Sequence, residues 1–257
     1  MDEMTALAET LERVPADAPT ACAGWVAHDL MAHLAAGAAE MADLIDGTLA
    51  DDRARPTRDM RDREAPFVAM GDDTLRSALR AQSGRLVGAL MRLAQMGDDA
   101  TVAFAGRASN AATLALHGRS EAALHRWDLV GTDATSRELL AQPELTAHGV
   151  VVLNEMLDGS PECIAARSRR AGVDDLHARL ASPGQPDVVI VADDHGAHLW
   201  IAEPDGDPTV VADPATRLLM LWGRRHDPAR VSWIGPETVC AQVCAVLEAP
   251  YRNTRAA

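Results

Sequence analysis

The feature that most constrains this chain is the segment Leu116–Gly131, which reads LHGRSEAALHRWDLVG and is predicted to be helical. It contains His117, Glu121 and His125, each four residues from the next. Because a helix makes one turn in about 3.6 residues, these three side chains share one helical face. Imidazole and carboxylate groups on one face can supply part of a metal site. The same spacing also occurs as ordinary His–Glu pairing on a solvated surface, so the pattern alone leaves both interpretations open.

A second helix is predicted over Trp25–Thr48 and contributes another histidine, His33. Its apolar residues recur at three- and four-residue spacing, which is typical of a helix with one buried face; they are Leu30, Leu34, Gly37, Met41 and Leu44. His33 lies at the edge of this stripe, beside small residues that leave room for a metal ion or a ligand. A hydrogen-bonded core histidine would fit the same position. Two helices that each present an inward His or Glu match the metal sites of helical bundles.

The run TACAGWVAHDLMAHLAAG, followed by GRSEAALHRWDLVG, resembles the mycothiol-dependent maleylpyruvate isomerase family. The resemblance covers most of residues 1–160 and implies a DinB-like, metal-binding four-helix bundle. It also implies that His33, Glu121 and His125 bind zinc or another divalent metal, and that mycothiol is a cofactor. The flanking residues that agree with the family motifs are Trp25, Asp29, Trp127 and Asp128. The resemblance does not require His117, which is interpreted as a pocket residue or a solvated helix residue.

The character of the sequence changes after Gly172, where short β-branched and alternating segments begin. Predicted strands are Val188–Val191, Ala197–Ala202, Thr209–Val211 and Val231–Ile234, and predicted helices are Pro214–Leu221 and Glu237–Leu247. Strands mixed with two helices predict a small α+β domain. This part is similar, more loosely, to the sterol-carrier-like C-terminal domain of the same family. The run LLMLWGRR carries that likeness and implies that Arg224 helps to shape the active site; an arginine capping its helix is the alternative.

The predicted fold class is therefore α+β, with a DinB-like helical bundle over residues 1–160 and a smaller C-terminal α/β domain over residues 172–257. Further helices are predicted over Met1–Val14, Asp73–Gln95, Ala108–Val130 and Leu139–Leu157. Pro143 is expected to break or restart the last of these. The segment Asp51–Pro66 is rich in Arg, Asp and Pro without periodicity, and is predicted to be an exposed loop.

Charge and composition exclude several classes of function. The net charge of −14 argues against nucleic acid and anionic membranes as partners. The chain contains no lysine, which excludes a Schiff-base lysine and a Walker A loop. An alanine-rich chain whose basic residues are all arginine suggests a GC-rich genome, in agreement with an actinobacterial source in which mycothiol is the main small thiol. Without a signal peptide, zinc-finger cysteine spacing or an apolar run of about 20 residues, a cytoplasmic monomer or small homo-oligomer is expected.

Three protein ligands of the His/Glu type are typical of a catalytic zinc site, because a fourth position stays open. An open site can bind a thiol and remove its proton, which suits cis–trans isomerisation by thiolate addition and elimination. Asp128, one turn after His125, is expected to orient that ligand, and an arginine to hold an acidic small-molecule substrate. The alternatives are a mycothiol S-transferase, a zinc-water hydrolase, for which the H-E-x-x-H motif is absent, and a non-catalytic metal-binding protein.

Overall fold

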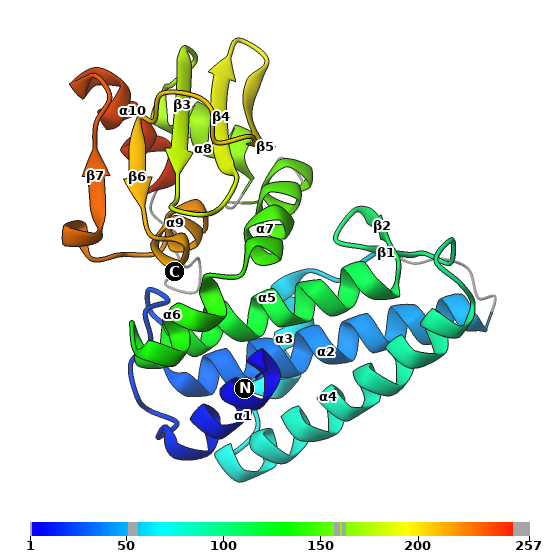
Figure 1. The fold of residues 1–257 in the computed structure, drawn as a ribbon. Coiled ribbons are helices and arrows are strands. Elements are labelled where there is room, and N and C mark those ends of the chain that lie inside the picture. The colour runs from blue at the N-terminus through cyan, green and yellow to red at the C-terminus, as the bar shows by residue number, and fades with distance from the viewer. Residues whose placement is uncertain (1, 51–55, 157–159, 161–162, 249–257) are drawn as a thin grey trace. The chain divides into compact units, whose positions relative to one another are not determined.

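A computed structural model describes residues 2–50, 56–156, 160 and 163–248 (Figure 1). The chain divides into two compact units. One comprises Met4–Leu129, and the other comprises Met1–Glu3 with Val130–Ala257. The first is mainly helical and the second contains the larger sheet, so the predicted α+β fold class is confirmed. Within the described ranges, none of the helices combines the length and apolar character that a membrane span requires.

The helical unit follows the sequence prediction closely. Its helices are α1 (Glu3–Arg13), α2 (Ala27–Leu49), α3 (Met60–Val68), α4 (Asp72–Gln95) and α5 (Ala111–Val130), and its strands are β1 (Val102–Phe104) and β2 (Arg107–Ser109). Helix α5 begins at Ala111 rather than at the predicted Ala108. Residues 107–109 pair with β1 instead, in a hairpin in which Phe104 lies opposite Arg107. Ala105 and Gly106 form its turn with positive φ angles of 50° and 83°, a conformation that favours glycine.

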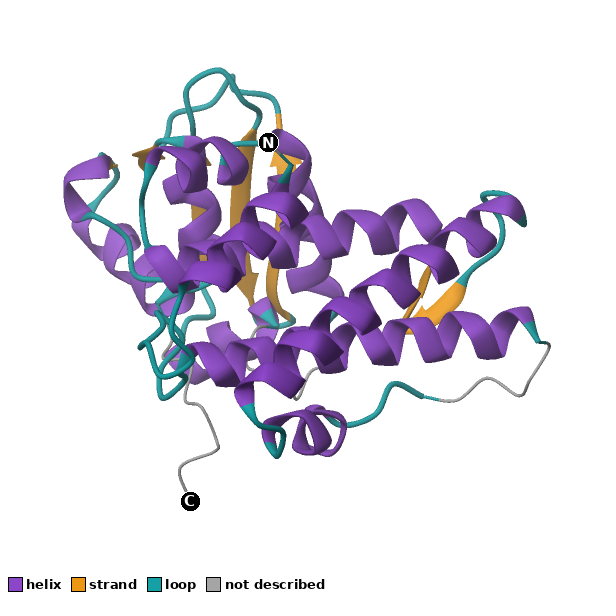
Figure 2. Cartoon of the chain, turned by 90° about the horizontal axis from the view of Figure 1, so that it is seen from below, coloured by secondary structure: helices purple, strands orange, loops and turns teal. Residues whose placement is uncertain are grey.

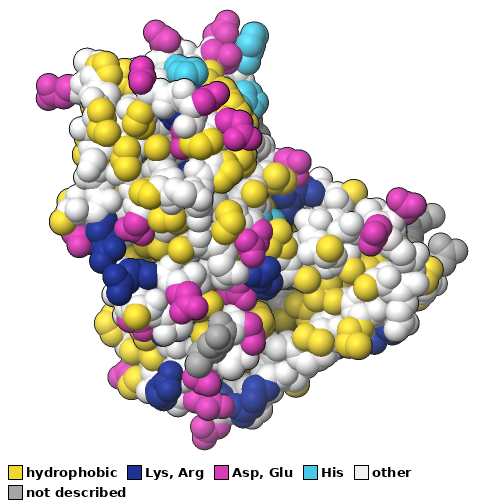
Figure 3. Space-filling view, viewed as in Figure 1, with side chains coloured by type: hydrophobic (Ala, Val, Ile, Leu, Met, Phe, Trp, Pro, Cys, Tyr) yellow, Lys and Arg dark blue, Asp and Glu magenta, His cyan; other side chains and the backbone are white. Residues whose placement is uncertain are grey.

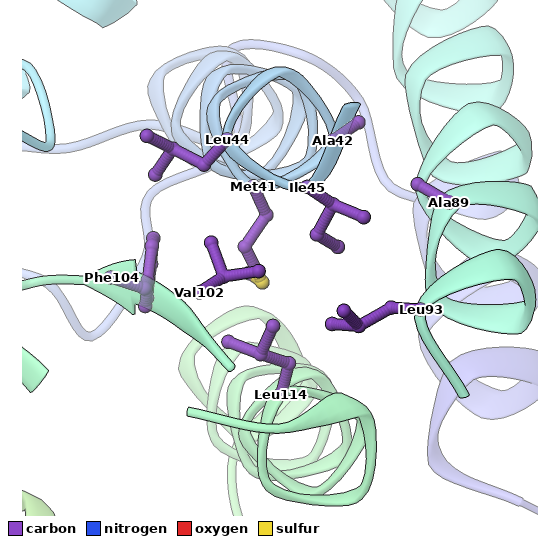
Figure 4. Close-up of a cluster of buried hydrophobic side chains, with 9 residues drawn as sticks. All are labelled: Met41, Ala42, Leu44, Ile45, Ala89, Leu93, Val102, Phe104 and Leu114. Carbon is purple, nitrogen blue, oxygen red and sulfur yellow. The ribbon is translucent and has the colours of Figure 1, made fainter. Parts of the chain in front are cut away.

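Two apolar clusters build the core of the helical unit, and α2 contributes to both. At one end α1 packs on α2, α4 and α5 through Leu7, Leu11, Met31, Ala32, Ala35, Leu75 and Ala122. At the other end the β1–β2 hairpin covers the bundle, and Val102 and Phe104 face side chains of α2, α4 and α5 (Figure 4). Of the predicted apolar stripe, Leu30, Met41 and Leu44 are buried, whereas Leu34 and Gly37 are only partly buried. Helix α2 also buries residues outside that stripe, such as Met31 and Ile45.

The predicted loop over Asp51–Pro66 is wrong from residue 60 onward, since residues 60–66 belong to α3, whereas residues 56–59 lie outside any helix or strand. Residues 51–55 lie outside the described residues. Asp59 caps α3, because its side chain accepts a hydrogen bond of 2.9 Å from the backbone N–H of Arg61. The sequence gives no apolar periodicity for this helix, because the side chain that it buries most deeply is a carboxylate. That side chain is Glu64, which is 1% exposed.

In the second unit a five-stranded sheet has the order β5-β4-β3-β6-β7. Its strands are β3 (Leu176–Ala181), β4 (Asp187–Asp193), β5 (Gly196–Ala202), β6 (Val210–Ala212) and β7 (Val231–Trp233). Only the β3–β6 pair among these is parallel. Strand β3 was not predicted, because its sequence LHARLA is rich in residues that also favour helices. Apart from the β1–β2 hairpin, the strands drawn in Figure 2 belong to this sheet.

The second unit also contains the helices after α5, which are α6 (Ala134–Leu140), α7 (Pro143–Glu155), α8 (Ile164–Ala171), α9 (Pro214–Leu221) and α10 (Glu237–Leu247). Pro143 does restart a helix, as expected. Helix α6 packs on α9, and α7 packs on β5 and α9. These two helices therefore group with the sheet, and the compact helical unit ends at Leu129, before the boundary at residue 160 that the sequence suggested.

Candidate metal centre

The three predicted ligands come together inside the helical unit, where α2 supplies His33 and α5 supplies Glu121 and His125. Glu121 Oε2 lies 3.3 Å from His125 Nε2 and 3.6 Å from His33 Nε2. One donor atom from each residue lies within 4.8 Å of the other two. The two imidazole rings meet edge to face, with centroids 5.2 Å apart and planes at 72°. The donor set and its spacing fit a divalent ion bound by two nitrogens and one oxygen.

Each histidine is oriented by a buried carboxylate on its other nitrogen. His33 Nδ1 lies 2.7 Å from Glu64 Oε1, and His125 Nδ1 lies 2.9 Å from Asp128 Oδ2. An ionised carboxylate can only accept a hydrogen bond, so each Nδ1 carries the proton. In the neutral rings both Nε2 lone pairs then face Glu121. A carboxylate behind a histidine ligand is the usual device that fixes its tautomer and orientation in metal sites.

The protonation states of Glu121 and His125 depend on each other. Burial opposes ionisation of Glu121, but hydrogen bonds from His125 and His33 outweigh it and hold the Glu121 pKa well below its ordinary value of 4.5. Burial also opposes protonation of His125, but contacts with Asp128, Cys22 and Glu121 raise the His125 pKa well above 6.5. Without a metal ion, the proton on His125 therefore balances the carboxylates around it. A bound cation would replace that proton.

The model of the family described as "Mycothiol maleylpyruvate isomerase N-terminal domain" matches residues 1–130. The chain belongs to this family. A crystal structure of the mycothiol-dependent maleylpyruvate isomerase superposes with a TM-score of 0.59 at 18% identity, covering 88% of this chain and 86% of that one. The structure of a histidine-to-alanine mutant of that isomerase gives 0.60 at 16% identity and covers 91% of each chain. At such identities the likeness shows the shared fold. Among curated proteins, none matches this chain.

Asp128 lies where the sequence placed it, behind His125, whereas Glu64 was missed. Glu64 is 31 residues from His33 in the sequence, within a segment predicted to be an exposed loop. No periodicity marks it, and only the packing of α3 against α2 carries its carboxylate to the histidine. The one local signal is the helix-capping Asp59 a few residues earlier, which marks a helix but not the direction of its side chains. The candidate metal centre thus has one orienting residue that sequence reasoning could not supply.

His117 lies on the same face of α5 but takes part in a different contact. Its ring packs against that of Phe104, with centroids 5.5 Å apart. Burial lowers the pKa of His117. The negative charge of Glu121 opposes this shift, and the positive charges of Arg107 and Arg63 add to it. Among the described residues, neither group of donor atoms with metal-like spacing includes His117. His117 is therefore partly buried against Phe104 and lies outside both groups of donor atoms.

Arg224 belongs to the second unit, directly after α9. Gly223 adopts a left-handed φ of 68°, its N–H bonds Met220 O at 2.9 Å, and the Arg224 N–H bonds Leu219 O at 2.9 Å. This pattern is a Schellman motif, which ends the helix. The guanidinium Nη1 donates to Trp222 O at 3.3 Å. The capping role has direct support from this contact, and the active-site role stays a prediction.

The pH dependence of stability follows from these two pKa shifts. The His125 contribution to folding is complete below pH 6.5 and is lost as the pH rises through its raised folded-state pKa. The Glu121 contribution is present above pH 4.5 and is lost as the pH falls through its lowered pKa. We expect chelator-treated protein to unfold at lower urea concentration at alkaline pH than between pH 4.5 and 6.5. The Glu121→Gln variant should lose less stability to urea than the wild type as the pH becomes alkaline. An equal loss would contradict the coupling between Glu121 and His125.

Substitution of Glu64 by glutamine should weaken metal binding without removing a ligand. The amide oxygen of glutamine can still accept a hydrogen bond from His33 Nδ1–H. It lacks the negative charge that makes the imidazole a stronger metal ligand. Partners of this kind typically contribute about 10- to 100-fold in metal affinity, so a loss in that range is expected. Competition with a chromophoric chelator measures it. Glu12→Gln, at an exposed position of α1, is the control, and unchanged affinity in Glu64→Gln would contradict the role.

Proposed function

We propose that this chain is a mycothiol-dependent, zinc-assisted enzyme that isomerises a cis-alkenyl dicarbonyl acid, as the name maleylpyruvate isomerase implies for its structural relatives. The observation that carries the proposal is the convergence of His33, Glu121 and His125. Both Nε2 atoms face Glu121 Oε2, while buried carboxylates hold both Nδ1 atoms. A set of three protein ligands is the pattern of a catalytic rather than a structural zinc site.

The protein residues act as ligands and orienting groups in this proposal. A bound zinc ion supplies Lewis acidity, which lowers the pKa of a thiol from its free value of about 8.5. Glu64 and Asp128 keep the histidine Nε2 lone pairs directed at the same point. His33 and His125 are therefore not available as general acids or bases. The low pKa of Glu121 likewise keeps it ionised and unsuited to donate a proton.

The thiol must come from outside the chain. Cys163 and Cys240 are buried, and burial raises the pKa of the partly buried Cys244 in α10. Cys22 donates its thiol hydrogen to Asp128. We therefore assign the nucleophile to a thiol from outside the chain. We propose mycothiol as this external thiol, because the description of the family names it.

The proposed reaction conserves atoms and electrons. A bound mycothiol thiolate would supply the nucleophile for reversible addition to the conjugated alkene. The C–S bond that would form on addition would break again on elimination, and the substrate's carbonyl oxygen would hold the electron pair while the former double bond rotates. No external oxidant, reductant or proton donor is consumed.

Two alternatives use the same residues. A mycothiol S-transferase would stop after addition and protonate the adduct, and a non-catalytic metal-binding protein would turn over nothing. Product analysis by chromatography coupled to mass spectrometry, with maleylpyruvate and with or without mycothiol, separates the three, because cis and trans isomers of equal mass differ in retention time. An isomer of unchanged mass supports the proposal. A product heavier by one mycothiol identifies the transferase, and conversion without thiol contradicts both thiol-dependent functions.

Replacement of Arg224 tests the remaining predicted site residue. If its guanidinium binds the substrate carboxylate, Arg224→Ala removes a charge-assisted hydrogen bond of about 1.5–3 kcal/mol. This corresponds to a loss of about 10- to 100-fold in kcat/KM. The adjacent Arg225 is exposed, and Arg225→Ala is the matched control. An equal, small loss in both variants would leave Arg224 as the helix-ending residue alone.

A further inference from the structure

We infer that Cys22 is a positioning residue of the metal centre, in which its thiol holds Asp128 and Asp128 in turn holds His125. The inference rests on the proposed function, because it takes His125 as a metal ligand. It assigns a role to a cysteine that the thiol chemistry itself does not use. The three residues form a second group of donor atoms, all within 4.8 Å of one another.

The contacts run in a chain toward the centre. Cys22 Sγ donates to Asp128 Oδ2 at 3.3 Å, and the same oxygen accepts from His125 Nδ1 at 2.9 Å. His125 Nε2 then lies 3.3 Å from Glu121 Oε2. The carboxylate of Asp128 is fully buried, so its charge depends on such donors rather than on water. A thiol hydrogen on Oδ2 restricts rotation of the carboxylate and therefore the direction of the imidazole behind it.

Hydrogen bonds of the backbone hold the turn that carries Cys22, and they do not depend on the Cys22 side chain. The Cys22 N–H bonds Thr20 Oγ1 at 3.2 Å, and the Trp25 N–H bonds Cys22 O at 3.0 Å. The neighbouring Ala21 N–H bonds Asp128 O at 2.7 Å, so the turn is attached to the backbone of α5 at the same residue whose side chain the thiol contacts. Substitutions at Cys22 should therefore leave the turn intact. Any change at the metal centre then reports on the thiol contact itself.

The expected effect is moderate. Groups that contact a ligand directly contribute about 10- to 100-fold in metal affinity. Cys22 acts one residue further away, and a thiol is a weak donor. We therefore expect Cys22→Ala to weaken metal binding by about 3- to 10-fold. Cys22→Ser keeps a donor in the turn and should restore at least part of the loss. Cys244→Ala, at a partly buried cysteine of the other unit, is the control and should change nothing.

A double-mutant cycle separates this role from simple packing. Zinc affinity is measured by chelator competition, without any thiol substrate, for wild type, Cys22→Ala, Asp128→Ala and the double variant. If the thiol acts through Asp128, Cys22→Ala weakens binding in the wild-type background but not in the Asp128→Ala background. The same loss in both backgrounds, or no loss in wild type, overturns the inference.

A second measurement keeps the inference testable if Asp128→Ala does not fold or if the wild type binds no zinc. In the metal-free protein, the hydrogen-bonded Nδ1–H of His125 should give a protected, downfield proton resonance in the NMR spectrum. Faster solvent exchange of that proton in Cys22→Ala supports the inference, and an unchanged rate overturns it. A wild type without zinc would count against the proposed function alone, so the two failures are distinguishable.

Discussion

Replacement of His125 by alanine is expected to remove the metal ion and with it all thiol-dependent turnover. His125 is the most enclosed of the three proposed ligands, with a side chain 7% exposed, compared with 15% for His33 and 25% for Glu121. It also connects Glu121 to Asp128, so its loss leaves the buried Asp128 carboxylate and the partly exposed Glu121 carboxylate without this partner. Since partners behind a ligand already contribute about 10- to 100-fold, loss of the ligand should cost at least about 100-fold in affinity.

The measurement is metal content per chain by mass spectrometry after dialysis, with circular dichroism to confirm the fold. His117→Ala is the matched control, because His117 lies on the same face of α5 and contacts Phe104. That variant should keep its metal. Full metal retention in His125→Ala would contradict the ligand assignment, and metal loss in both variants would make His117 a fourth ligand and close the open position.

Direct binding of mycothiol sulfur to the metal is the second large expected effect. In a cobalt-substituted enzyme, saturating mycothiol should produce a strong sulfur-to-metal charge-transfer absorption, because a coordinated thiol is deprotonated. Turnover of a cis-alkenyl dicarbonyl acid should rise with the same dependence on mycothiol concentration. Without added thiol, turnover should fall to background, since none of the four cysteines is placed to replace it.

The control for this experiment is a mycothiol analogue in which sulfur is replaced by oxygen. It should occupy the thiol site without producing the absorption band and should inhibit turnover. Turnover without thiol, or an unchanged cobalt spectrum at saturating thiol, would contradict the mechanism and favour zinc-water hydrolysis. On the face seen in Figure 3, acidic and arginine side chains lie interspersed with one another.

Local sequence was sufficient for most of the helices and for the shared face of two of the three proposed ligands. Helices α2 and α4 lie within two residues of their predicted limits, and α10 has the predicted limits, because their apolar periodicity and their end residues agree. The spacing of Glu121 and His125 placed them on one face, since helix geometry is the same wherever a helix forms. His33 joined them through the resemblance to the family, and its role as a ligand stays a prediction.

The orienting groups required the tertiary structure. Glu64 approaches His33 across 31 residues of sequence and Cys22 approaches Asp128 across 106. No local pattern encodes either contact, because each depends on how separate segments pack: α3 on α2, and the turn before α2 on the end of α5. The β1–β2 hairpin shortened α5 for the same reason, since strand pairing satisfied backbone groups that a longer helix would otherwise have used. The sequence by itself thus predicted which side chains could bind a metal, and the packing decided that Glu64 contacts His33 and that the Cys22 thiol contacts Asp128.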